Sequence, residues 1–257
     1  MPKLLNQTDA ETGTTLHNFQ YSHVSIDKLL ASEYTIVQLT IDKSSSVYAF
    51  KTELEKTIGM VLEACKKSPR VENLLLRVVT FSTQGSQASI EEIHGFQLLK
   101  SISPDQYVGC INPCGMTPLN DASLDSLESM EELGKTLNKN NYKVNAVGYL
   151  ITDGAENSSK NSMQNVKKQL SAMRKSEVLE SVKLVLIGVN DSECKTELEL
   201  YKKETGIDQY ISINEVTPKK LGQLAAFISE SISSTSTNLG NPGSNQVNTS
   251  TLPSLSL

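Results

Sequence analysis

The chain has 257 residues, enough for one large α/β domain or two small ones, and its hydrophobic content of 38% is ordinary for a globular protein. The formal net charge of −5 argues against a nucleic-acid partner, because proteins that bind phosphate backbones carry a basic surface. No apolar run approaches the roughly 20 residues that span a bilayer, so we expect no membrane partner.

The N-terminal residues and the cysteines predict a cytoplasmic location. Residues 1–7 lack the apolar segment of a secretory signal. The four cysteines are interpreted as free thiols, as expected under reducing conditions. A disulfide between Cys110 and Cys114 is an open alternative. A zinc site at this pair is not favoured, because the three histidines are distant in sequence.

Apolar runs alternate with helical periods after residue 33. Near-continuous apolar runs, typical of strands buried on both faces of a parallel sheet, cover residues 34–41, 74–81, 144–152 and 182–189. A mixed segment around residues 94–98 predicts an edge or antiparallel strand. Apolar side chains at three- and four-residue spacing predict helices over residues 47–65, 127–137, 163–173, 194–201 and 218–232. This alternation predicts an α/β fold with a doubly wound, mostly parallel sheet and helices on both faces.

Composition divides the chain into three parts. Residues 1–33 show no clear period and are interpreted as an N-terminal arm packed against the domain. Residues 34–232 contain the predicted α/β domain. From Ser233 onward the chain is rich in Ser, Thr, Asn, Gly and Pro and has almost no charge. Such a segment buries too little apolar surface to offset its ordering entropy, so residues 233–257 are predicted to form a flexible tail.

Oxygen-bearing side chains follow two of the predicted strands and one loop. Asp42, Ser44 and Ser46 come directly after the first apolar run, in the pattern Asp-x-Ser-x-Ser. Thr117 lies in Gly-Met-Thr-Pro-Leu, and Asp153 lies in Ile-Thr-Asp-Gly. Ligands of an open α/β sheet bind outside the carboxyl ends of its strands, where three such loops can converge. Carboxylate and hydroxyl oxygens suit a hard divalent cation such as Mg²⁺.

These three segments, in this order, resemble the metal-ion-dependent adhesion site of von Willebrand factor A (VWA) domains. Asp42, Ser44, Ser46, Thr117 and Asp153 match the five metal-site positions of that family one for one. The resemblance covers roughly residues 34–232 and implies a Rossmann-like VWA fold with an intact metal site. Because the chain is expected to be cytoplasmic, it is most similar to the intracellular members found in bacteria and phages.

The resemblance implies binding rather than catalysis. Two carboxylates and three hydroxyls leave one coordination position of Mg²⁺, or of Mn²⁺, for an outside oxygen. In this family an acidic side chain of a partner protein commonly fills that position. Intracellular members often act as adaptors for ATPases, so we expect a protein partner that supplies a carboxylate, with an ATPase among the candidates. The motifs include no general base or activated nucleophile, so no enzyme is predicted.

Two alternatives remain open. The chain could be a structural or assembly component in which the metal mainly staples loops together. It could also be a metal-dependent phosphotransferase or hydrolase, although Ser44 occupies the position of the second aspartate that one such class requires. Within the motifs, Lys43 is expected to point to solvent and Glu156 to lie on the rim of the site. The regular apolar face of residues 218–232 would allow that helix to slide by one turn.

Overall fold

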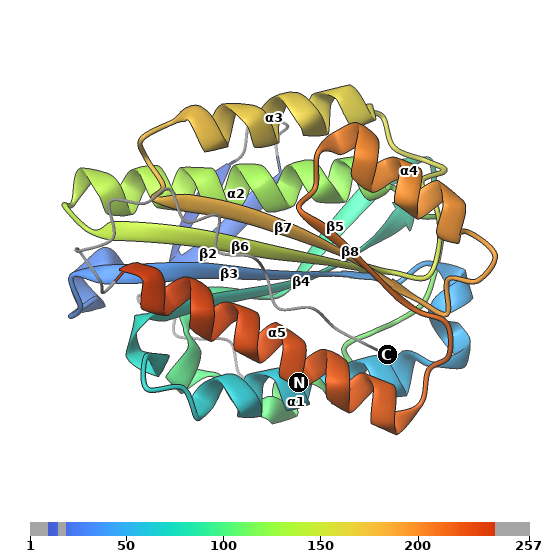
Figure 1. The fold of residues 1–257 in the computed structure, drawn as a ribbon, viewed down its shortest axis with the longest axis horizontal. Coiled ribbons are helices and arrows are strands. Elements are labelled where there is room, and N and C mark those ends of the chain that lie inside the picture. The colour runs from blue at the N-terminus through green and yellow to red at the C-terminus, as the bar shows by residue number, and fades with distance from the viewer. Residues whose placement is uncertain (1–9, 15–18, 240–257) are drawn as a thin grey trace.

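An eight-stranded sheet forms the centre of the structure, a computed structural model that describes residues 10–14 and 19–239 (Figure 1). The strand order is β1-β2-β5-β4-β3-β6-β7-β8. The strands are β1 (Ala10–Thr14), β2 (Gln20–Val24), β3 (Glu33–Asp42), β4 (Leu74–Gln84), β5 (Gln87–Leu98), β6 (Lys143–Thr152), β7 (Ser181–Val189) and β8 (Gln209–Ile213). All neighbouring strands pair in parallel except β1 with β2 and β4 with β5.

Helices cover both faces of the sheet (Figure 1). On one face lie α1 (Lys51–Lys66) and α5 (Pro218–Leu239), and on the other lie α2 (Leu119–Lys139), α3 (Met163–Lys175) and α4 (Lys195–Thr205). Each helical layer encloses its own apolar core against the sheet. Short 3₁₀ turns occupy Ile26–Lys28, Ser45–Ala49, Val71–Asn73, Leu99–Ser101 and Pro104–Tyr107. The predicted doubly wound, mostly parallel α/β fold is therefore confirmed. No helix in the described ranges is long and apolar enough to cross a membrane.

The sheet extends further toward the N-terminus than the sequence predicts. β5 is antiparallel to β4, as expected, but it is not an edge strand, because β2 pairs with its other side through His23 and Phe96. The segment interpreted as an N-terminal arm thus includes two strands of the sheet. The main-chain N–H and the hydroxyl of Ser22 donate to the Glu92 carboxylate over 3.0 and 2.7 Å, which attaches β2 to β5.

The closing helix is longer than predicted. α5 continues to Leu239, so the predicted boundary at residue 232 lies inside it. Polar contacts stabilise the added turns: Asn145 Nδ2 donates to the carbonyl oxygen of Thr235 over 2.8 Å, and Arg70 Nε donates to the Ser236 hydroxyl over 3.0 Å. These contacts belong to the register that α5 has in this structure, and a slide by one turn stays a prediction. The rest of the predicted tail, residues 240–257, lies outside the described residues.

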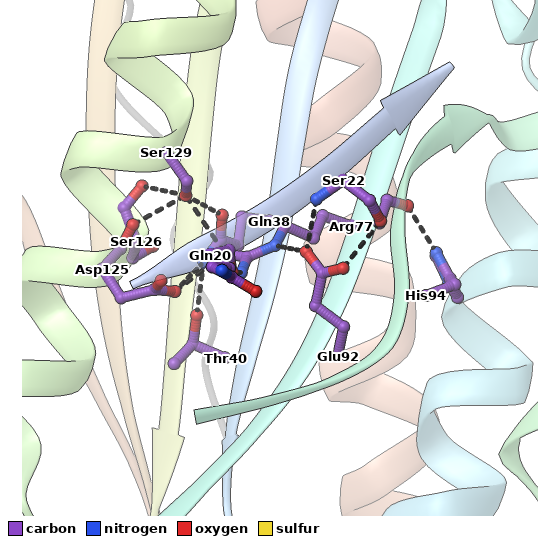
Figure 2. A network of polar contacts seen from close by, with 11 residues as sticks. Gln20, Ser22, Gln38, Thr40, Arg77, Glu92, His94, Asp125, Ser126 and Ser129 are labelled. Carbon is purple, nitrogen blue, oxygen red and sulfur yellow. Dashed lines mark hydrogen bonds and ion pairs between the residues drawn. The ribbon is translucent and has the colours of Figure 1, made fainter. Parts of the chain in front are cut away.

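A buried polar network joins the sheet to α2 (Figure 2). Arg77 in β4 is fully buried and donates to Asp125 Oδ2 over 2.7 Å and to Glu92 Oε1 over 2.6 Å. It also donates to the Ser129 hydroxyl over 3.1 Å, and Gln38 donates to Asp125 over 3.3 Å. Because Glu92 also binds Ser22, the Arg77 guanidinium links β4, β5 and β2 to α2 through charged hydrogen bonds.

Candidate metal site

The predicted ligands lie at the carboxyl ends of two neighbouring strands. β3 and β6 run side by side in parallel, with Ile41 opposite Ile151. Asp42 therefore ends β3 where Thr152 ends β6, and Asp153 follows at once. The 3₁₀ turn Ser45–Ala49 then leads from β3 into α1, which keeps the serines beside the strand end. This arrangement follows from the parallel pairing of two buried strands.

Hydrogen bonds connect four of the five predicted residues. The Ser44 and Ser46 hydroxyl oxygens are 3.0 Å apart, and Ser46 Oγ donates to Asp153 Oδ1 over 2.9 Å. Asp42 is buried and accepts the main-chain N–H of Ser44 at Oδ1 over 2.7 Å. Its other oxygen accepts the Thr152 hydroxyl over 2.6 Å. Two carboxylates and two hydroxyls thus gather at one edge of the sheet.

Thr117 comes to the same place from a third segment, two residues before α2 begins. Its hydroxyl oxygen lies 3.3 Å from where a Cβ atom on Gly154 would stand, so it is next to the loop that carries Asp153. Ser45 binds the carbonyl oxygen of Gly115 through its N–H and its hydroxyl, both over 3.2 Å, which joins this segment to the serine loop. A side chain at Gly115 would stand 2.3 Å from the Thr83 carbonyl oxygen, and its φ of +72° also favours glycine.

The charge of the site fits a cation. Burial raises the pKa of Asp42 to about 7, although hydrogen bonds from Thr152 and Ser44 oppose the shift, and the nearby charge of Asp153 raises it further. Burial also raises the pKa of Asp153. A bound divalent cation would favour the charged form of both carboxylates. With three hydroxyls they form an all-oxygen ligand set suited to Mg²⁺ or Mn²⁺. The five residues fit such an ion, and their role as ligands stays a prediction.

Ligands of other types do not gather elsewhere in the described ranges. No three His, Cys, Asp or Glu side chains there are grouped so that they could hold a metal ion. All four cysteines are free thiols in this structure, including Cys110 and Cys114.

The expectation that Lys43 points to solvent is wrong. Its side chain is only 5% exposed, and Nζ lies 2.6 Å from the carboxylate of Glu91, which is 58% exposed. The Lys43 N–H donates to the Phe81 carbonyl oxygen over 2.9 Å, so the residue continues the pairing with β4 and turns its side chain toward the β4–β5 hairpin. The hydrogen bond and charge of Lys43 lower the pKa of Glu91. The charge of Lys43 is therefore balanced by Glu91, next to the candidate site.

Sequence reasoning missed the residues that hold the ligands in place. Thr152 binds Asp42, and Asn157 binds the main chain of Thr117. Glu156, whose expected place on the rim stays a prediction, accepts the main-chain N–H of Asn120 in the first turn of α2 over 2.7 Å. Hydrogen bonds between loops leave no periodic pattern in a sequence, and only the position of Thr152 directly before Asp153 could have drawn attention.

Comparison with known proteins supports the fold. No family model matches the sequence, and no curated protein matches it. Among solved structures, the pilus adhesin SpaC from Lactobacillus rhamnosus GG matches with a TM-score of 0.55 and 11% identity, covering 84% of this chain and 32% of that chain. A von Willebrand factor type A structure from Catenulispora acidiphila matches with a TM-score of 0.51 and 12% identity, covering 88% of this chain and 50% of that one.

A third similar structure is that of a metal-binding protein. Proximal thread matrix protein 1 from the mussel byssus, with a zinc-occupied MIDAS motif, matches with a TM-score of 0.50 and 19% identity, covering 78% of this chain and 46% of that one. The chain thus spans between a third and a half of the length of these proteins. At such identities the likeness shows the fold alone, and that fold is the Rossmann-like fold of VWA domains.

Proposed function

We propose that the chain is a non-enzymatic protein-interaction module that binds an acidic group of a partner through a divalent cation, Mg²⁺ or alternatively Mn²⁺. The cation would be held by Asp42, Ser44, Ser46, Thr117 and Asp153. The observation that carries the proposal is the meeting of three loops at the carboxyl ends of β3 and β6, where Ser46 binds Asp153 and Ser44 lies against Ser46. The similar structures that are described as an adhesin and a matrix protein support a binding role.

The residues of the chain explain why the partner group should be a carboxylate. Asp42 and Asp153 together offset the charge of a divalent cation, and the hydroxyls add no charge. One coordination position is left for an outside oxygen, because the chain supplies five ligands and Mg²⁺ takes six. A carboxylate is the anionic oxygen ligand that proteins have available for that position. Lys43 does not compete for it, because it is paired with Glu91.

Exposed apolar side chains beside the candidate site would extend the contact. Tyr48 follows Ser46 by two residues and is 73% exposed, and Met116 precedes Thr117 and is 50% exposed. The Lys51 ammonium lies over the Tyr48 ring, 5.8 Å from its centroid, and adds a positive charge near the same turn. A partner segment with an acidic residue beside apolar ones would match this rim.

The proposal is tested by capture of a partner with and without chelator. Wild-type protein on a resin is incubated with extract of its source cells in Mg²⁺, and retained proteins are eluted with EDTA. The proposal predicts a protein, an ATPase among the candidates, that the Asp153→Asn variant does not retain. The eluted protein is then purified, and charge reversal of one of its Asp or Glu residues should lower its affinity as much as chelator does. Equal affinity with and without EDTA would contradict the proposal.

A structural role for the metal is the second candidate, because the loops are already tied to one another. Ser45 binds Gly115, and Thr117 binds Asn157, so a cation would add one more link between the same segments. In that case EDTA would lower the melting temperature while leaving partner binding unchanged. If the chain is an interaction module, EDTA should instead abolish partner binding.

A cytoplasmic location is part of the proposal. The four free cysteines support it, since free thiols suit a reducing compartment. Fractionation of the source cells tests it, and recovery of the protein at the cell surface would contradict it.

A further inference from the structure

The loop after β6 holds Thr117 by both polar groups of its main chain. The N–H of Thr117 donates to Asn157 Oδ1 over 2.8 Å, and the N–H of Asn157 donates to the Thr117 carbonyl oxygen over 3.2 Å. Asn157 lies four residues after Asp153. One loop therefore carries a predicted carboxylate ligand and also the residue that fixes the main chain of a predicted hydroxyl ligand.

Thr117 depends on such a hold because of where it lies. No helix or strand is described between the 3₁₀ turn that ends at Tyr107 and α2, which begins at Leu119. Apart from the bond of the Leu119 N–H to the Thr117 carbonyl oxygen over 3.0 Å, the main chain of Thr117 takes its position from contacts with other loops. Metal coordination tolerates only about ±0.2 Å in ligand distance, so a small movement of this segment would remove the hydroxyl from a cation.

Glu156 gives the loop of Asn157 a defined position of its own. Its carboxylate accepts the N–H of Asn120 in α2 over 2.7 Å and the N–H groups of Ser158 and Ser159 over 2.8 and 2.7 Å. The loop is thus attached to α2 directly before Asn157 and to β6 directly before Asp153. Because its base is fixed, the Asn157 side chain can set the distance between Thr117 and Asp153.

We propose that Asn157 is a positioning residue of the metal site, which holds the main chain of Thr117 so that its hydroxyl faces the cation. The inference rests on the proposed function, because it assigns Asn157 a role toward the same ion. Without Asn157 the main-chain N–H of Thr117 would lose its partner, whereas the other four predicted ligands would keep the hydrogen bonds that link them. Residues that orient metal ligands typically contribute 10–100-fold to affinity.

Calorimetric titration with Mn²⁺ alone tests the inference on the purified full chain. Asn157→Ala should bind about tenfold more weakly than wild type. Asn157→Asp, which keeps an oxygen to accept the Thr117 N–H, should recover the affinity. Asn161→Ala is the matched control: it removes an amide from the same loop that binds Asp121 over 2.8 Å, and its affinity should equal that of wild type.

Two further measurements separate positioning from a general loss of structure. If Asn157 acts through Thr117, the double variant Asn157→Ala/Thr117→Ala should bind Mn²⁺ as weakly as Thr117→Ala does and no more weakly. In the metal-free protein, amide hydrogen exchange at Thr117 should be faster in Asn157→Ala and unchanged in Asn161→Ala.

The outcomes distinguish this inference from the function on which it rests. No Mn²⁺ binding by the wild type would overturn both. Binding by the wild type with undiminished affinity in Asn157→Ala would overturn the inference alone. The inference alone would also be overturned if the double variant bound Mn²⁺ more weakly than Thr117→Ala by the full effect of Asn157→Ala. Unchanged hydrogen exchange at the Thr117 amide in Asn157→Ala would overturn it too.

Discussion

Replacing Arg77 by methionine should destabilise the protein by about 3–5 kcal/mol, the usual cost of leaving one member of a buried ion pair without its partner. Arg77 and Asp125 are both fully buried and lie 2.7 Å apart. Asp125 also accepts a longer bond from Gln38, at 3.3 Å, which cannot neutralise its charge. Glu92 is 23% exposed and can be hydrated when Arg77 is replaced. Most of the lost stability therefore comes from the unpaired, buried charge of Asp125 (Figure 2).

Urea denaturation followed by circular dichroism measures the effect. Arg174→Met is the matched control, because Arg174 forms a 2.7 Å ion pair with Asp208 in which both side chains are about a third exposed, and exposed pairs contribute at most about 1 kcal/mol. The double variant Arg77→Met/Asp125→Leu removes both charges and should regain most of the lost stability. If Arg77→Met lowers the free energy of unfolding no more than Arg174→Met does, the buried ion pair does not stabilise the fold.

Two further predictions concern stability. Burial lowers the pKa of His94 from an ordinary 6.5 to about 4. The contribution of the neutral, buried imidazole to the free energy of unfolding is therefore complete above pH 6.5 and is lost as the pH falls through 4. The free energy of unfolding should therefore fall by about 3 kcal/mol over that interval, and by less in His94→Gln; equal pH dependence of the two proteins would count against this assignment. Ending the chain after Ile232 rather than after Leu239 should lower the free energy of unfolding by at least about 2 kcal/mol, because Asn145 and Arg70 lose their partners in α5; thermal melts that coincide for the two truncated chains would show that the last turns of α5 do not stabilise the fold.

The central strands could be predicted because they are buried on both faces. Such strands are continuous apolar runs, and β3, β4, β6 and β7 lie where those runs predict them. β2 and β8 have five residues each and alternate between buried and partly exposed positions, which is too short a pattern to recognise. The extent of α5 was missed because its last turns are attached through polar groups, with the Thr235 main-chain carbonyl bound by Asn145 of β6 and the Ser236 hydroxyl bound by Arg70.

The candidate site could be predicted to the level of its five oxygen-bearing residues. Four of them directly follow two apolar runs that the sequence predicts as strands, and the parallel pairing of those strands, β3 and β6, brings their ends together. The surroundings could not be predicted in the same way. Whether Lys43 meets solvent or Glu91 depends on how the β4–β5 hairpin folds back, and the bond between Asn157 and Thr117 joins loops 40 residues apart.

Mn²⁺ binding measured by calorimetry on wild type and Asp42→Asn tests the central claim most directly. Asp42 is the buried carboxylate at the end of β3, and the isosteric change removes its charge while keeping its volume. Asp105→Asn, at an exposed aspartate in another turn, is the control. We expect one Mn²⁺ per wild-type chain, with micromolar to millimolar affinity, the same affinity in Asp105→Asn, and no binding in folded Asp42→Asn. Undiminished binding by Asp42→Asn would contradict the site.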